Sequence, residues 1–277
     1  MFESLKAVSE KKYIKMLLFG YAGVGKTVFG LSHPGKGYLI DFERGAAQYA
    51  DVFDNISTVS VTKWQEFDSA VDWLAKNKEQ DSFLVIDSET TYWDWMMYER
   101  SVHETKGSKD VGALNFADWG VVKKIDSNIH QKIRALNMDV IAIAHEKAVT
   151  NSNDYVNGYV PACNKVLPHS FDVTVRMTKD FDGKRKLSVE NRHGDWLMKD
   201  EYDVTGKTFF DVFKDDLKFA EDREVLIRMF KIKIMFCRKP EQLQELIKNI
   251  FETHHDLSEE DKAFIKDYGK KHLKKLI

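Results

Sequence analysis

Short apolar runs bounded by polar residues recur along the first two thirds of the chain, and they predict buried strands. Four of these runs are apolar over nearly their whole length, as strands covered on both faces of a parallel sheet must be. They lie at Ile14–Phe19, Gly37–Ile40, Phe83–Ile86 and Val140–Ala144. Apolar side chains also recur at helical spacing over residues 62–78 and 116–137, which predicts two amphipathic helices. Strands that alternate with helices indicate an α/β fold with a mostly parallel sheet.

The pattern changes towards the C-terminus. Residues 171–178 alternate between apolar and polar, the pair Asp182-Gly183 is a turn signal, and residues 186–191 form the return strand of a predicted β-hairpin. Helical patterns then follow at residues 221–236, 241–254 and 258–276. We therefore expect an α/β core over residues 1–205, with the β-hairpin as an extension, and a small helical C-terminal region over residues 206–277. The polar stretches 103–115 and 148–166 predict loops.

Composition narrows the class of protein. The 277 residues are 43% hydrophobic and 31% charged, which is ordinary for a globular protein with a full core. The formal net charge of −2 excludes a uniformly basic coat for nucleic acid but allows a local basic groove. The sequence contains no run of about 18 apolar residues, so it predicts no membrane-spanning helix. The charged N-terminus and two widely separated cysteines, Cys163 and Cys237, which fit free thiols, favour the cytoplasm.

Residues 20–27, Gly-Tyr-Ala-Gly-Val-Gly-Lys-Thr, fit the phosphate-binding pattern G-x-x-x-x-G-K-[ST]. A predicted strand precedes them and a predicted helix follows, which is the context that the motif requires. Glycines let the backbone turn its N–H groups towards phosphate oxygens, Lys26 reaches the β- and γ-phosphates, and the Thr27 hydroxyl ligates Mg²⁺. The sequence therefore predicts ATP and Mg²⁺ as ligands. The predicted nucleotide-binding residues are Gly20, Tyr21, Ala22, Gly23, Val24, Gly25, Lys26, Thr27 and Val28.

Polar residues at the ends of the other strands supply candidate chemistry. Asp87 closes an apolar run and is expected to hold Mg²⁺ together with Thr27. Glu43 follows the second run and is the expected catalytic carboxylate that polarises a water molecule, with Glu89 as a rival. His145 follows the 140–144 run, where it could sense the γ-phosphate. These residues meet if their strands are parallel, because open α/β sheets bind ligands at the carboxyl ends of their strands.

The order and spacing of these motifs resemble the RecA-like branch of P-loop ATPases over roughly residues 12–200. Residues 38–46 resemble the segment that carries that branch's catalytic Glu, and 84–88 resemble its Mg²⁺ motif. Residues 141–145 stand where the family has a strand that ends in a γ-phosphate-sensing Gln, with His145 in place of Gln. Residues 189–194 are similar to the Lys-Asn-Arg-x-Gly motif of RadA-type proteins, with Glu190 in place of Lys and Arg192 retained. The resemblance implies that Arg192 reaches the ATP of a neighbouring subunit.

Within that branch the chain looks most like phage-encoded, RecA-like single-strand annealing ATPases of the Sak type. The resemblance implies a homo-oligomer, ring or filament, that binds single-stranded DNA beside a single-strand-binding protein, in the host cytoplasm if phage-encoded. The expected function is ATP-dependent recombination or annealing. A helicase or replication motor on the same core and a non-catalytic nucleotide-gated switch remain alternatives. Lysines in the two polar stretches are expected to contact DNA phosphates: Lys106, Lys109, Lys147 and Lys165.

Overall fold

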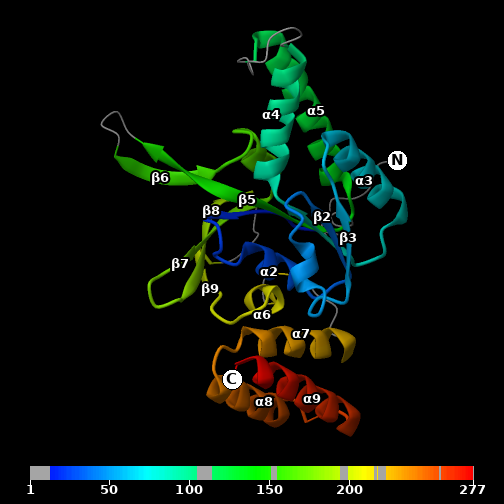
Figure 1. Ribbon diagram of the computed structural model, residues 1–277, viewed down its shortest axis with the longest axis vertical. Helices are drawn as coiled ribbons and strands as arrows, with labels where there is room; N and C mark the ends of the chain where they lie inside the picture. The colour runs from blue at the N-terminus through cyan, green and yellow to red at the C-terminus, as the bar shows by residue number, and fades with distance from the viewer. Residues whose placement is uncertain are drawn as a thin grey trace.

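A single mixed sheet forms the centre of the molecule in the computed structural model (Figure 1). The structure describes residues 13–104, 114–150, 155–193, 199–214, 217, 223–255 and 257–276. Nine strands of these residues join the sheet, eight of them in the order β3-β2-β4-β5-β1-β7-β8-β9, and β6 pairs with β5 outside this path. The pairs from β3 to β7 are parallel, whereas β8, β9 and β6 add antiparallel pairs. The predicted α/β fold with a mostly parallel sheet and a β-hairpin is confirmed.

The strands and helices alternate along the first half of the chain. The strands are β1 (Lys15–Gly20), β2 (Gly37–Asp41), β3 (Ile56–Ser60), β4 (Phe83–Asp87), β5 (Asp139–Thr150), β6 (Val156–Pro161), β7 (Val173–Lys179), β8 (Arg185–Arg192) and β9 (Glu201–Asp203). The α-helices are α2 (Lys26–Leu31), α3 (Trp64–Asn77), α4 (Glu89–Glu104), α5 (Phe116–Ala135), α6 (Phe209–Phe213), α7 (Arg223–Phe236), α8 (Pro240–Thr253) and α9 (Glu259–Leu276). Two short 3₁₀ helices complete the described elements: η1 (Ala46–Tyr49) and η2 (Leu167–Ser170).

Helices cover both faces of the parallel sheet, as the continuous apolar runs require. Helices α3, α4 and α5 pack on one face, where Leu17 and Phe19 of β1 join their apolar cluster. Helices α2, α6 and α7 pack on the opposite face, which receives Met16 and Leu18 of the same strand. Figure 1 shows the two groups of helices above and below the sheet. Alternate side chains of β1 therefore enter two different cores, which leaves only its C-terminal end free for chemistry.

Three segments differ from the sequence-based expectation or lie outside it. The prediction of a loop over residues 148–166 is wrong, because β5 continues to Thr150 and pairs with β6 in an antiparallel ribbon. This ribbon is largely exposed, so its sequence is polar and carries no apolar run. Helix α4 occupies the aromatic-rich residues after β4, and β3 is an edge strand with mostly exposed side chains. Neither has a strong period, so neither was predicted.

The C-terminal helices pack beneath the core. Helices α7, α8 and α9 share a cluster of their own, whereas α6 and the other side of α7 join the apolar cluster of the sheet. Local sequence fixes two helix starts by reciprocal hydrogen bonds between side chain and backbone: Thr208 with Asp211 opens α6, and Ser258 with Asp261 opens α9. The boundary expected at residues 205/206 stays a prediction. Among the described helices, none is both long and apolar enough to cross a membrane.

Candidate active site

Strand register brings the strand-end residues to one edge of the sheet. Gly20 at the end of β1 lies opposite His145 of β5, and Asp41 at the end of β2 lies opposite Asp87 at the end of β4. Asp87 in turn lies opposite Ile143, two residues before His145. Because all four strands are parallel, their carboxyl ends form a continuous row. Residues that are far apart in the sequence therefore surround the loop that follows β1.

The loop between β1 and α2 has a backbone that glycine permits. Gly23 and Gly25 have φ values of 78° and 107°, in the left-handed region where side chains with a Cβ are strained. At Gly20 a Cβ would lie 2.3 Å from the carbonyl oxygen of Met177 on β7. The loop can thus pack against β7 and still turn its backbone N–H groups towards the cavity. Such a cradle before a helix N-terminus fits a phosphate group.

Lys26 lies at the centre of this cradle. Its Nζ donates to the backbone carbonyl oxygens of Gly20 and Tyr21 at 2.9 and 3.0 Å. Burial lowers the pKa of the Lys26 amine, although the negative charges of Asp87 and Glu43 oppose this effect. A buried cation beside backbone N–H groups suits a polyanionic ligand, because it supplies charge where water is largely excluded.

Thr27 and Asp87 form the pair expected of a Mg²⁺ site. The Thr27 hydroxyl donates to Asp87 Oδ2 at 2.6 Å. Burial raises the pKa of Asp87 to about 6, and the nearby charges of Glu43 and Asp41 act in the same direction against the Thr27 hydrogen bond. A buried carboxylate among other acids fits a divalent cation, and hydroxyl and carboxylate oxygens are the ligands that Mg²⁺ prefers. The residues present therefore fit the predicted ion.

Glu43 lies beside this pair and receives several hydrogen bonds. Its Oε1 accepts from Ser88 Oγ at 2.7 Å, from His145 Nε2 at 3.0 Å and, more weakly, from Thr91 Oγ1 at 3.4 Å. Burial opposes ionisation of Glu43, but these hydrogen bonds outweigh it and lower the pKa of the carboxyl. All the contacts that the described residues make to this carboxylate reach Oε1. Among the described residues, none donates a hydrogen bond to Oε2.

Asp41 fixes the segment that carries Glu43. Its buried carboxylate accepts hydrogen bonds from the backbone N–H groups of Glu43, Gly45 and Ala46 at 3.0, 3.3 and 2.9 Å. Arg44 in this turn has a φ of 57°, which is uncommon for a residue with a side chain. Three hydrogen bonds to one carboxylate hold this backbone shape. Asp41 therefore positions the turn that carries Glu43, and it also lines the cavity beside Glu43 and Asp87.

Glu89, the rival carboxylate, points away from the phosphate loop. It is 1% exposed, and both of its oxygens lie 3.2 Å from His130 Nε2. His130 also contacts Asp126 through Nδ1 at 3.2 Å, and Asn164 donates to that second carboxylate. The two acids raise the pKa of His130 well above its ordinary value, although burial opposes them. Of the two candidate carboxylates, Glu43 lines the cavity, whereas Glu89 at the start of α4 lies in a buried cluster with His130 and Asp126.

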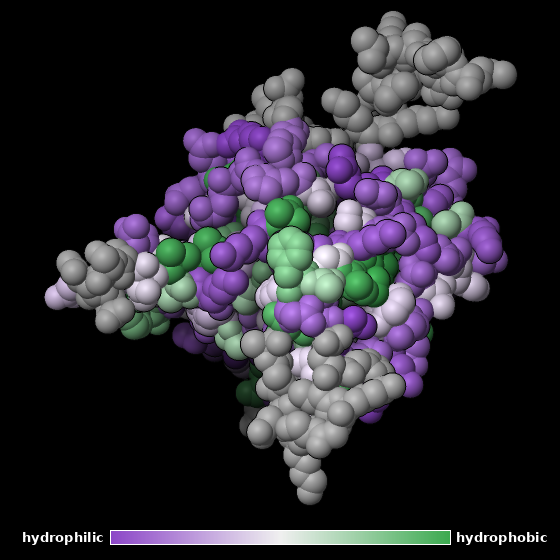
Figure 2. Space-filling view, turned by 90° about the horizontal axis from the view of Figure 1, so that it is seen from above, coloured by the Kyte–Doolittle hydropathy of each residue, from purple (hydrophilic) through white to green (hydrophobic). Residues whose placement is uncertain are grey.

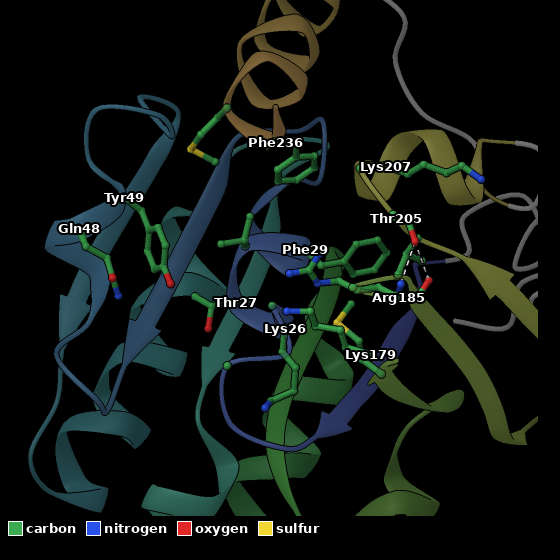
Figure 3. A pocket seen from close by; sticks show the side chains of 18 of the residues that line it. Lys26, Thr27, Phe29, Gln48, Tyr49, Lys179, Arg185, Thr205, Lys207 and Phe236 are labelled. Carbon is green, nitrogen blue, oxygen red and sulfur yellow. Dashed lines mark hydrogen bonds between the residues drawn. The ribbon is translucent and has the colours of Figure 1, made fainter. Parts of the chain in front are cut away.

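Two further side chains at the cavity were not predicted. Figure 3 shows Tyr49 directing its hydroxyl towards Thr27 from η1, and Arg185 beside the phosphate loop. Burial raises the pKa of Tyr49, and the charges of Asp87 and Glu43 add to this effect. Arg185 Nε donates to the carbonyl oxygen of Val24 at 2.8 Å. The predicted turn at Asp182-Gly183 was the sequence signal that could have indicated Arg185. This turn joins the end of β7 near the phosphate loop to the start of β8, and Arg185 is the first residue of β8.

The cavity extends far beyond the phosphate loop. Its volume is about 1510 Å³, and it reaches from Glu43 and His145 to the C-terminal helices. The helical side contributes Phe236 at the end of α7, Arg238 between α7 and α8, and His272 of α9. Pockets for small ligands usually span about 300–1,000 Å³, so this cavity exceeds the volume that most such ligands fill.

The remaining predicted residues lie away from the phosphate loop. Arg192 ends β8 opposite Val173, the first residue of β7, and forms an ion pair with Asp200. The hairpin turn near the phosphate loop lies at the pair of Lys179 with Arg185, at the other end of β8. Arg192 follows Arg185 by seven residues along this strand, so about 23 Å separates the two. The proposed action of Arg192 on a neighbouring subunit stays a prediction.

Of the four lysines predicted to contact DNA, two lie among the described residues and two lie outside them. Lys147 is exposed on the β5–β6 ribbon, and Lys165 is exposed between β6 and η2. Lys106 and Lys109 lie outside the described residues. The stretch that contains them was expected to follow a strand at the ligand edge, but it follows α4 instead. Because α4 has 16 residues, its far end lies about 22 Å from Glu89. Figure 1 shows that end at the top of the molecule, away from α2.

Comparison with known proteins adds one finding. The family model described as an AAA domain matches residues 12–197, which is more than half of the chain. The matched segment contains the phosphate loop, Glu43, Asp87, His145 and the β7–β8 hairpin, and it ends before α6. No curated protein matches the sequence.

Proposed function

Because this chain belongs to the AAA domain family, we propose that it hydrolyses ATP at the phosphate loop and couples this reaction to single-stranded DNA. The observation that supports hydrolysis most is the meeting of three features at one end of the cavity. They are the Thr27–Asp87 pair, the buried cation of Lys26, and the Glu43 carboxylate with its hydrogen bond from His145. A site that only bound a nucleotide would not need an ionised carboxylate at that end.

Glu43 is the proposed general base. Its lowered pKa keeps the carboxylate ionised at neutral pH. Oε2 accepts a proton from the attacking water as the water oxygen bonds to the terminal phosphorus, and the bond from that phosphorus to the bridging oxygen breaks and releases ADP. Ser88, Thr91 and His145 hold Oε1 and so fix the plane of the carboxylate. His145 also lines the cavity, so its Nε2–H could exchange the contact with Glu43 for one with a phosphate oxygen, which fits the sensing role expected for it.

Lys26 and the loop backbone bind and orient the triphosphate. The amine exchanges its contacts with the Gly20 and Tyr21 carbonyls for contacts with phosphate oxygens. Thr27 and Asp87 are the residues that would hold Mg²⁺, which when bound neutralises charge on the phosphates. Tyr49 of η1 lines the same end of the cavity.

Glu43→Gln tests the proposed base. The amide keeps the size of the side chain but cannot accept a proton, so ATP should still bind while turnover falls by about 10²-fold or more. Glu89→Gln is the matched control, because Glu89 lies in the buried cluster with His130. The measurements are ATP affinity by calorimetry and phosphate release. If Glu89→Gln lost turnover and Glu43→Gln kept it, the assignment of the base would be wrong.

The β5–β6 ribbon supports the proposal of single-stranded DNA as a partner. One of its faces carries Lys147, Val149 and Val160, and the exposed Tyr155 precedes β6. The other face is anchored to the core, since Arg176 lies 4.1 Å from the ring centroid of Tyr159. Figure 2 shows apolar side chains next to the projecting arm at the left, among hydrophilic ones. Lysines beside exposed aromatic and apolar side chains suit a backbone of phosphates with unstacked bases.

The ribbon also continues the strand that carries His145. Lys147 follows His145 by two residues, so the proposed DNA contact and the proposed phosphate sensor share one rigid strand. This continuity supports coupling of ATP hydrolysis to DNA.

Annealing or recombination is the proposed outcome of this coupling. The alternatives are a motor on the same core and a nucleotide-gated switch, which differ from it in duplex unwinding and in ATP turnover. Unwinding of duplexes would favour the motor, and ATP binding without turnover would favour the switch. We also propose that the chain forms a homo-oligomer and works beside a single-strand-binding protein.

Replacement of the four predicted lysines tests the DNA partner. The variant Lys106→Ala, Lys109→Ala, Lys147→Ala, Lys165→Ala should bind single-stranded DNA more weakly and with a flatter dependence on salt, because fewer counterions are released. Lys248→Ala is a control, since this exposed lysine lies on α8 at the opposite end of the molecule from the ribbon (Figure 1). Fluorescence anisotropy at several salt concentrations measures both quantities. Equal affinity and equal salt slope for the quadruple variant and the unmodified protein would refute the placement.

A further inference from the structure

The two ends of the large cavity differ in chemistry. At one end lie the residues proposed for hydrolysis, Glu43 and His145, on strands to one side of β1. At the other end lie the turn at residues 204–207 and the end of α7 with Met235 and Phe236. The phosphate loop separates the two ends. A nucleoside triphosphate whose terminal phosphate meets Glu43 must therefore direct its nucleoside towards the second end.

The second end is apolar where it meets the C-terminal helices. Phe236 is partly buried against the cluster that contains Phe29 of α2, and it also lines the cavity. Figure 3 shows the Phe236 ring near Phe29, below the end of α7, with Thr205 and Lys207 on the opposite side. A flat aromatic face is the surface on which a purine base stacks. The turn across from it also lines the cavity, with Thr205 hydrogen-bonded to the backbone of Arg185 and Lys207 paired with Asp203, so the polar groups of the ribose would meet a turn held in a fixed shape.

Helix α7 is held in this position by contacts with the core. Lys231 Nζ lies 2.7 Å from Asp54 Oδ2, and Lys233 Nζ lies 2.7 Å from Asp211 Oδ1 of α6. Arg228 donates to the carbonyl oxygen of Pro34, just after α2. The wall is thus part of the folded protein. It also lies beyond residue 197, where the match to the AAA domain ends.

We propose that Phe236 and Met235 of α7, facing the turn at residues 204–207, form the binding site for the adenosine half of ATP. This inference rests on the proposed binding of ATP at the phosphate loop. It assigns base recognition to the C-terminal helical region, which the family match does not cover. Bound ATP then contacts both the core and the helical region, and it stabilises their contact.

Two ligands separate the halves of the site. Inorganic tripolyphosphate occupies only the phosphate half, whereas ATP occupies both. Phe236→Ala should weaken ATP binding about tenfold, as expected for the loss of one aromatic stacking contact, and leave tripolyphosphate affinity unchanged. Phe116→Ala is the matched control, because this exposed aromatic side chain at the start of α5 does not line the cavity. Calorimetry of both ligands with each protein gives the four affinities.

A second variant protects the test against loss of structure. Phe236→Leu keeps apolar volume against the core cluster and removes only the ring, so ATP affinity should still fall by about threefold. Unchanged ATP affinity in both variants, or an equal loss for ATP and tripolyphosphate, would overturn the assignment. If the unmodified protein bound neither ligand, or if Lys26→Ala bound both normally, the proposed function itself would fail. The two failures are therefore distinguishable.

Discussion

His130→Ala should destabilise the protein strongly, because it removes the cation that lies between two buried carboxylates. His130 is 3% exposed and lies between the carboxylates of Glu89 and Asp126, which are 1% and 4% exposed. His130→Ala would leave two buried carboxylates without their cation. Removing one partner of a buried ion pair typically costs about 3–5 kcal/mol. We therefore expect the free energy of unfolding at neutral pH to fall by about this amount, whereas the exposed control His255→Ala should change it by less than about 0.5 kcal/mol.

The pH dependence gives the prediction its sign. In the unmodified protein the pKa of His130 is raised, so its stabilisation is complete below its unfolded pKa and is lost as the pH rises through the raised folded value. In His130→Ala the two buried carboxylates lose their counterion, and burial then opposes their charge. The variant binds extra protons when folded and loses stability as the pH rises from about 4 to about 7. The difference between the proteins should therefore grow over this range.

Urea unfolding at pH 5 and pH 7, followed by circular dichroism, measures both effects. The double variant Glu89→Gln, His130→Ala removes one of the unpaired charges and should regain part of the lost stability. A loss below about 1 kcal/mol at pH 7, or a loss that does not depend on pH, would refute the reasoning that this cluster is ionic. Glu89→Gln that unfolds normally but no longer hydrolyses ATP would show that Glu89 has a catalytic role.

Three further expectations concern Lys26 and Gly20 at the phosphate loop and Arg192 at the far end of β8. Lys26→Ala should abolish tight ATP binding in calorimetry, since the phosphates lose their buried cation, and near-normal affinity in a folded variant would contradict the phosphate site. Gly20→Ala should lower the melting temperature, because its Cβ would meet the Met177 carbonyl oxygen at 2.3 Å, and an unchanged melting temperature would show that β7 can move away. Arg192→Ala mixed with Lys26→Ala should recover part of the ATPase activity that each lacks alone if Arg192 acts between subunits. No recovery in proven mixed oligomers would argue against that role.

Residues at strand ends were predictable because a parallel sheet has a simple rule. A polar residue that closes an apolar run must lie at the carboxyl edge, and parallel register then brings it close to the others. Asp87 and His145 follow this rule directly. The rule does not choose between Glu43 and Glu89, because both follow strand ends. That choice depends on which way each side chain turns after its strand ends. The contact with His130 of α5 holds Glu89 on the side away from the cavity.

Residues that approach the site through tertiary packing were not predictable in the same way. Tyr49 reaches the cavity only because Asp41 shapes the turn before η1, and Phe236 reaches it only because α7 docks beneath α2. Neither position has a local pattern that distinguishes it from an ordinary core residue. The β5–β6 ribbon was missed for a related reason, since an exposed ribbon with few apolar side chains has the composition of a loop.

The difference between the two groups has a physical consequence for the site. Asp87 ends a strand of the buried sheet, Lys26 begins the helix that packs on that sheet, and Asp41 at the end of β2 holds the turn that carries Glu43, so the positions of all three follow from the folded core. Phe236 depends instead on α7, which is joined to the core by buried apolar side chains, among them Met229 and Ile232, and by the Lys231–Asp54 pair, whose acid is exposed. The nucleoside end of the cavity therefore depends on the docking of a separate helix onto the core. A ligand that contacts both ends would favour the docked position of α7, because binding adds its own free energy to that arrangement.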